Sequence, residues 1–113
     1  MAEKIRFPFA DADIVALTAT GAQALKIVND MTIVDGVTTE ATGNRTLNLT
    51  IDPLVTVGAR IFIKSKTNGT ETTIFGTGMS GATITGVAGK TKCVEFVYDG
   101  SKFVEAGTPV QID

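Results

Sequence analysis

Apolar and polar residues alternate without a break from residue 46 to residue 51. Leu47, Leu49 and Ile51 occupy one side of an extended chain, and threonine or asparagine occupies each position between them. This two-residue period is typical of a β-strand with one buried face and one face in water. Residues 59–64 alternate in a similar way, so we expect strands over both segments.

The last third of the chain contains a strong hairpin signal. Two β-rich runs flank the pair Asp99-Gly100, which favours a tight turn between antiparallel strands. Two registers fit this sequence. A two-residue turn at Asp99-Gly100 places Phe96 opposite Phe103. A turn centred on Gly100-Ser101 instead pairs Tyr98 with Phe103, and either register gives an aromatic cross-strand contact.

Further turn signals divide the rest of the chain into short segments. Asp35-Gly36 and Asn68-Gly69 lie between β-compatible runs, and the second pair predicts a hairpin that joins residues 59–64 to residues 70–75. No stretch favours a helix longer than about two turns. We therefore predict an all-β fold: a single-domain antiparallel β-sandwich or small barrel of about seven to nine strands over residues 14–113.

Residues 1–13 are expected to form an extended N-terminal arm. Ile5, Phe7 and Phe9 are apolar, but Pro8 has no backbone N–H and cannot join the middle of a β-ladder. Two interpretations remain open: an edge strand that packs into the domain's own core, or a docking arm whose phenylalanines bind a neighbouring subunit. Ile5, Phe7, Pro8 and Phe9 are thus the candidate contacts to a subunit or a capsid.

Composition excludes several classes of partner. The formal net charge is −2, which disfavours nucleic-acid binding. No segment approaches the roughly 20 apolar residues of a membrane span, and no signal peptide precedes the first strand. We expect a chain made in the cytoplasm, without a membrane partner. Cys93 is the only cysteine and is expected to act as a small buried hydrophobe.

Catalytic and cofactor chemistry is weakly represented. The chain has no histidine, which leaves serine nucleophiles without an activating base and a zinc site without its usual ligands. The segment Gly76-Thr-Gly-Met-Ser-Gly81 matches a dinucleotide-binding pattern, but no helix follows to hold a pyrophosphate. The aspartates lie beside turn residues, where carboxylates usually accept hydrogen bonds from their own backbone. We therefore expect a protein without catalytic activity, cofactor or metal.

Three segments together resemble the small β-rich virion proteins of tailed bacteriophages. They are Arg45-Thr-Leu-Asn-Leu-Thr-Ile-Asp52, Val57-Gly-Ala-Arg-Ile-Phe-Ile63 and Glu95-Phe-Val-Tyr-Asp-Gly-Ser-Lys-Phe103. In those modules an alternating strand is followed by a glycine, a second strand, a glycine-rich loop and a closing Tyr-Asp-Gly hairpin. The resemblance covers residues 46–107.

The resemblance implies a virion structural protein of the capsid decoration or head-fibre type. Such proteins commonly form homotrimers on the particle surface, where they bind the major capsid protein or another virion protein. The alternative is a receptor- or carbohydrate-binding tail-fibre module. That module would need exposed aromatic side chains, and only Phe62, Phe75, Tyr98 and Phe103 could supply them.

Overall fold

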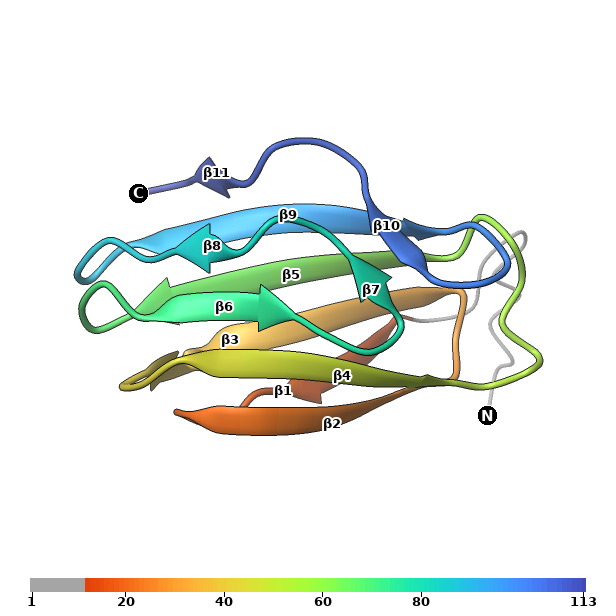
Figure 1. The fold of residues 1–113 in the computed structure, drawn as a ribbon, viewed down its shortest axis with the longest axis horizontal. Helices are drawn as coiled ribbons and strands as arrows, with labels where there is room; N and C mark the ends of the chain where they lie inside the picture. The colour runs from red at the N-terminus through yellow and green to blue at the C-terminus, as the bar shows by residue number, and fades with distance from the viewer. Residues whose placement is uncertain (1–11) are drawn as a thin grey trace, which may run out of the picture.

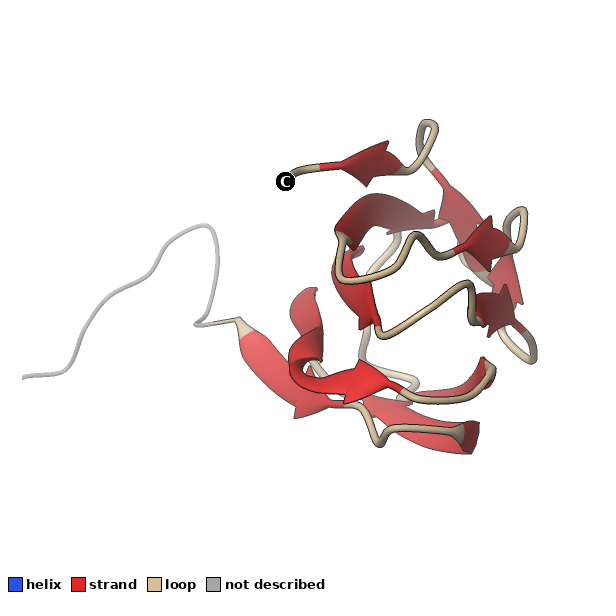
Figure 2. Ribbon diagram, turned by 90° about the vertical axis from the view of Figure 1, so that its left-hand side faces the viewer, coloured by secondary structure: helices blue, strands red, loops and turns tan. Residues whose placement is uncertain are grey.

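The computed structural model describes residues 12–113, which form eleven strands and no helix, and therefore no helix able to cross a membrane (Figure 1). The strands are β1 (Asp13–Ala16), β2 (Gly21–Ile27), β3 (Met31–Ala41), β4 (Arg45–Ile51), β5 (Arg60–Thr67), β6 (Thr72–Phe75), β7 (Met79–Ser80), β8 (Ile84–Thr85), β9 (Thr91–Tyr98), β10 (Phe103–Glu105) and β11 (Val110–Gln111). Figure 2 views them nearly end-on, around one interior.

The strands form two packed sheets, which confirms the predicted all-β, single-domain class. Sheet A has seven strands in the order β1-β3-β5-β9-β10-β7, with β11 beside β9, and sheet B has four in the order β2-β4-β6-β8. The chain alternates between the sheets from β1 to β6. Each of the strands β1 to β4 therefore pairs with the strand two places along the chain, and that partner runs in the same direction.

The pairing corrects the expectation of a mostly antiparallel fold with seven to nine strands. Within residues 12–113, five pairs are parallel (β1–β3, β3–β5, β2–β4, β4–β6 and β7–β10). Four are antiparallel (β5–β9, β9–β10, β9–β11 and β6–β8). The extra strands are two-residue segments near the C-terminal half: β7, β8 and β11. Turn residues predict that the chain reverses, but they do not predict which sheet the next strand joins.

The two glycine turn signals illustrate this error. Asn68-Gly69 connects β5 of sheet A to β6 of sheet B, so the predicted hairpin is wrong. Asp35-Gly36 is not a turn between strands at all, because it lies inside β3 at an irregularity in the pairing with β5. A Cβ on Gly36 would lie 2.7 Å from the Lys64 carbonyl oxygen and 2.9 Å from Arg45 Nη2, so only glycine fits there.

The terminal hairpin adopts the second of the two predicted registers. Tyr98 pairs with Phe103, and their rings lie 5.0 Å apart between centroids. The Asp99 N–H donates to the Lys102 carbonyl at 3.0 Å, and Gly100 has a φ of +100°. The positive φ explains the glycine, because residues with a Cβ rarely adopt it.

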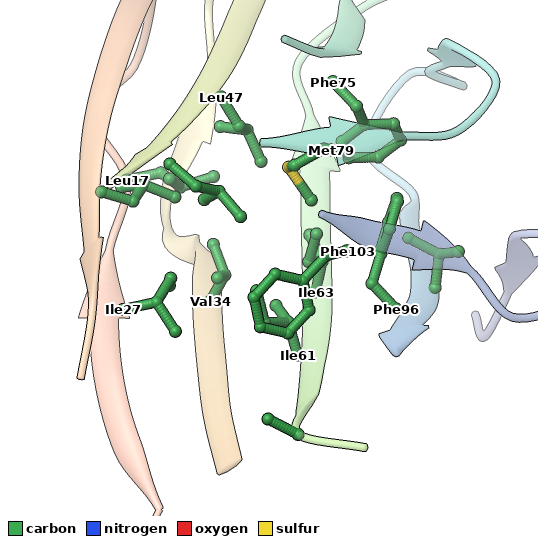
Figure 3. Packing of buried hydrophobic residues seen from close by; sticks show 14 of the residues in the cluster. Leu17, Ile27, Val34, Leu47, Ile61, Ile63, Phe75, Met79, Phe96 and Phe103 are labelled. Carbon is green, nitrogen blue, oxygen red and sulfur yellow. The ribbon is translucent and has the colours of Figure 1, made fainter. Parts of the chain in front are cut away.

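The core lies between the sheets and draws on both (Figure 3). Ile61, Ile63 and Val34 project from sheet A, and Leu47 and Ile27 from sheet B, all fully buried. In the antiparallel part, Phe75 and Phe96 meet edge to face at 4.7 Å between ring centroids. Such a ring pair stabilises a fold by about 0.5–1.5 kcal/mol beyond the area that it buries.

Candidate interaction surfaces

Several aspartates within residues 12–113 accept hydrogen bonds from the backbone, as predicted. Asp30, Asp52 and Asp99 each accept a backbone N–H within 3.0 Å. The N–H groups of Lys102 and Ser101 lower the pKa of Asp99. No three His, Cys, Asp or Glu residues in this part of the chain gather as a metal site would require. Asp11 lies outside the described residues.

The glycine-rich segment 76–81 is a close-packed connection between sheets. It leads from β6 into β7, which pairs with β10. A Cβ on Gly78 would lie 3.1 Å from Leu49 Cβ, and one on Gly81 would lie 2.8 Å from Phe96 Cζ. The glycines thus allow the loop to approach the core, which accounts for their spacing without a bound nucleotide.

The aromatic residues offer little platform for a sugar. Phe75 and Phe103 are buried in the core. Phe62 and Tyr98 are half-buried, and the Tyr98 hydroxyl donates to the Gly100 carbonyl at 3.1 Å. Two of the four aromatic candidates are therefore removed from any surface.

A buried arginine joins the two sheets at one end of the molecule. Arg45, on β4 of sheet B, has no exposed surface. Its Nη2 donates to the Gly36 carbonyl (3.1 Å), Ser65 Oγ (2.9 Å) and the Lys66 carbonyl (3.2 Å), all on sheet A. Its Nη1 donates to the carbonyls of Thr39 (3.0 Å) and Thr18 (3.2 Å).

The Arg45 guanidinium has no carboxylate among these partners. Burial lowers the pKa of Arg45, while the negative charge of Glu71 acts in the opposite direction. Five donated hydrogen bonds to backbone and hydroxyl oxygens replace the missing counter-ion. Ser65 Oγ continues the network to Thr73 Oγ1 at 2.9 Å. This is a structural cluster closed inside the fold, and it presents nothing to a ligand.

The outer face of sheet A carries an apolar stripe. Burial alternates along β3 and β5, so Val34 and Ile61 point into the core while Ile33 and Phe62 point outward. The strand register places Ile14, Ile33 and Phe62 in one row across three strands. The next row runs through Met31, Arg60, Val97 and Val104. We call Ile14, Met31, Ile33, Phe62, Val97 and Val104 the outer apolar stripe.

The stripe is open to solvent within residues 12–113. Ile14 is 68% exposed and Val104 is 37% exposed, and the other four residues are half-buried by their neighbours in the sheet. One ion pair lies within the stripe. Arg60 is opposite Val97 and Glu95 is opposite Phe62, and Arg60 Nη1 lies 3.1 Å from Glu95 Oε1, so this pair separates Phe62 from Val97. Asp35 and Lys64 are also opposite each other in the register. The surface is therefore close to neutral, with apolar residues on both sides of the Arg60–Glu95 pair.

The outer face of sheet B has the opposite character. Its outward residues are small or polar: Ala22, Ala24, Lys26, Thr46, Asn48, Thr50, Thr72 and Thr85, with Ile74 as the large apolar exception. Threonine and asparagine hydroxyl and amide groups hydrate readily, and this face needs no covering layer.

Cys93 also lies in sheet A and is buried, as predicted. The register sets it between Lys64 on β5 and Val110 on β11. Burial raises the pKa of its thiol, a change that Lys64 opposes. A thiol of this kind is protonated at neutral pH, which suits packing and not nucleophilic chemistry.

Sequence reasoning placed the interaction site elsewhere. Ile5, Phe7, Pro8 and Phe9, the predicted contacts, lie outside the described residues. The outer apolar stripe was missed, although the sequence contained its signal. Ile61-Phe62-Ile63 is an unbroken apolar run in the middle of a strand, and such runs indicate strands that are covered on both faces.

No family model, curated protein or solved structure matches this chain.

Proposed function

We propose that this chain is a non-enzymatic structural protein that assembles with copies of itself and decorates a bacteriophage capsid. The observation that carries the assembly is the outer apolar stripe. Apolar side chains gathered on one outer face favour protein–protein contact there. The composition favours the same class, because the sequence has no histidine to activate a serine nucleophile or to bind zinc.

The virion half of the proposal derives from sequence. The alternating strand at residues 45–52 and the Tyr-Asp-Gly hairpin at residues 98–100 resemble those of phage virion modules. The expected partners are further copies of the chain, as a homotrimer, and the major capsid protein or another virion protein. A compact two-sheet body with a polar face and an apolar face suits such a role, because one face can meet protein while the other meets water.

The mass of the protein in solution tests the assembly. Multi-angle light scattering of the full chain should give about 35 kDa, three times the mass of the 11.8 kDa chain. A dimer would reject the trimer and retain self-assembly. A monomer at every concentration up to the millimolar range would overturn self-assembly.

Immunogold electron microscopy of the particles of the encoding phage tests the location. An antibody against this chain should label capsids. Label confined to tail tips would favour the tail-fibre alternative over decoration, and unlabelled particles would overturn the virion half of the proposal.

A further inference from the structure

We infer that the outer apolar stripe is the binding site for residues 5–9 of a neighbouring copy of the chain. This inference rests on the proposed function and gives the assembly a defined contact. The arm and the stripe are different surfaces of the same chain. Passed in one direction around a closed ring, this contact gives the proposed trimer, whereas a reciprocal exchange of arms gives a two-fold dimer.

The arm matches the stripe in length and pattern. Ile5, Phe7 and Phe9 alternate with Arg6 and Pro8, so an extended chain presents three apolar side chains on one side. Five extended residues span about 17 Å. The stripe crosses from β1 through β3, β5 and β9 to β10, four strand spacings, or about 19 Å.

Pro8 is compatible with a segment that lies on the face of the sheet. An added edge strand would also admit Pro8, but only in the register that turns position 8 away from the ladder. A segment that lies across the face binds through side chains and loses nothing at the proline. Arg60 is paired with Glu95 and Lys64 is opposite Asp35 in the register, so neither cation strongly repels an arm that carries Arg6.

The short connection between residues 5–9 and β1 favours binding to a neighbouring copy. β1 begins at Asp13, so only residues 10–12 connect the arm to its own sheet A and to the outer face of that sheet. To return onto that face, the chain would have to reverse within residues 10–12. This segment, Ala10-Asp11-Ala12, contains no glycine, asparagine or proline, and only Asp11 favours a turn.

Disulfide trapping between two single-cysteine variants tests this contact. One variant carries Phe7→Cys and the other carries Val97→Cys, both in a Cys93→Ser background, and one of them has an affinity tag. After mixing, exchange of subunits and mild oxidation, we expect a covalent heterodimer on a non-reducing gel. The matched control replaces Val97→Cys by Thr46→Cys on the outer face of sheet B, and it should give no heterodimer.

The two cysteines placed together in one chain separate the remaining outcomes. If Phe7→Cys/Val97→Cys closes a disulfide inside a single chain, the arm binds its own sheet and the inference is overturned. If light scattering shows an oligomer but neither experiment traps a disulfide, the arm–stripe contact is overturned while self-assembly stands. If the full chain is a monomer, the proposed self-assembly fails first, and the contact between copies fails with it.

Discussion

The outer faces of the two sheets differ although the sheets share one core. On sheet B, the central strand β4 alternates strictly, and its outward side chains are Thr46, Asn48 and Thr50. On sheet A, the strand β5 carries Phe62 between two core isoleucines, and its outward neighbours on β3 include Ile33. The same two-residue period thus gives sheet B a polar outer face and sheet A an outer face with exposed apolar residues.

This difference separates what stability requires from what binding requires. The core between the sheets is complete, because Val34, Leu47, Ile61 and Phe96 are fully buried without any further layer. The outer stripe lies outside that core, and cross-strand packing half-buries four of its six side chains but leaves Ile14 and Val104 exposed. Association explains them, because covering apolar surface contributes about 25 cal/mol for each Å² that is removed from water.

The largest effect is expected at Arg45, which keeps the two sheets in place and thereby both outer faces. Arg45→Met should lower the free energy of unfolding by about 3–5 kcal/mol, since it removes five donated hydrogen bonds, of which those to the Gly36 carbonyl and Ser65 Oγ are buried. Urea unfolding followed by circular dichroism measures the change.

The matched control is Arg60→Met on the outer face of sheet A. The Arg60 side chain is 57% exposed in its ion pair with Glu95, so this change should cost about 0–1 kcal/mol. Equal losses in the two variants would mean that the hydrogen bonds of Arg45 do not secure the sheets.

The next effect tests the two outer faces directly. Phe62→Lys places a charge in the middle of the outer apolar stripe and should weaken self-association by about 2 kcal/mol or more, a roughly thirtyfold higher dissociation constant. Thr46→Lys places the same charge on the outer face of sheet B and should leave the dissociation constant unchanged. Analytical ultracentrifugation measures both. If Thr46→Lys dissociates the oligomer as strongly, the contact does not distinguish the faces.

The sequence predicts the strands of this fold better than their partners. Alternation located β4 and β5, and the Asp99-Gly100 turn located the hairpin of β9 and β10. The parallel order could not be predicted in the same way. Asn68-Gly69 produces a reversal in either case, and whether the next strand pairs with its predecessor or crosses to the other sheet depends on the packing of distant residues. The pair Asp35-Gly36 was wrongly interpreted as a turn signal. Gly36 is needed for another reason, because the Lys64 carbonyl and the Arg45 side chain leave no room for a Cβ.

The candidate site was only partly accessible to sequence reasoning. The apolar arm at residues 5–9 is visible as composition alone. The stripe depends on register, since Ile14, Ile33 and Phe62 lie far apart in sequence and become one row only when β1, β3 and β5 align in parallel. Sequence shows that Phe62 interrupts an alternating pattern, but it does not show which residues flank it across the sheet.

The smallest effect concerns a charge beside the stripe. Asp35, on the outer face of sheet A, has its pKa lowered to about 2 by hydrogen bonds from the Thr38 hydroxyl, the Val37 N–H and the Thr38 N–H. Its folded pKa lies below its unfolded value, so the carboxylate stabilises the fold above about pH 4, and this stability is lost as the pH falls through about 2. Because solvent screens this group, we expect a contribution of at most about 1 kcal/mol.

Comparison of the wild type with Asp35→Asn across pH isolates this contribution. At pH 6 the wild type should be more stable in urea by up to about 1 kcal/mol, and the difference should shrink towards zero near pH 1.5, where both side chains are uncharged. Thr38→Val removes the hydroxyl that contributes most to the low pKa of Asp35. In this variant the stability in urea should therefore change less between pH 6 and pH 1.5 than it does in the wild type. If wild type and Asp35→Asn differ in stability by the same amount at both pH values, the difference comes from the introduced amide and not from the loss of charge. In that case the negative charge of Asp35 would not contribute to the stability of β3, and only the packing of its side chain would.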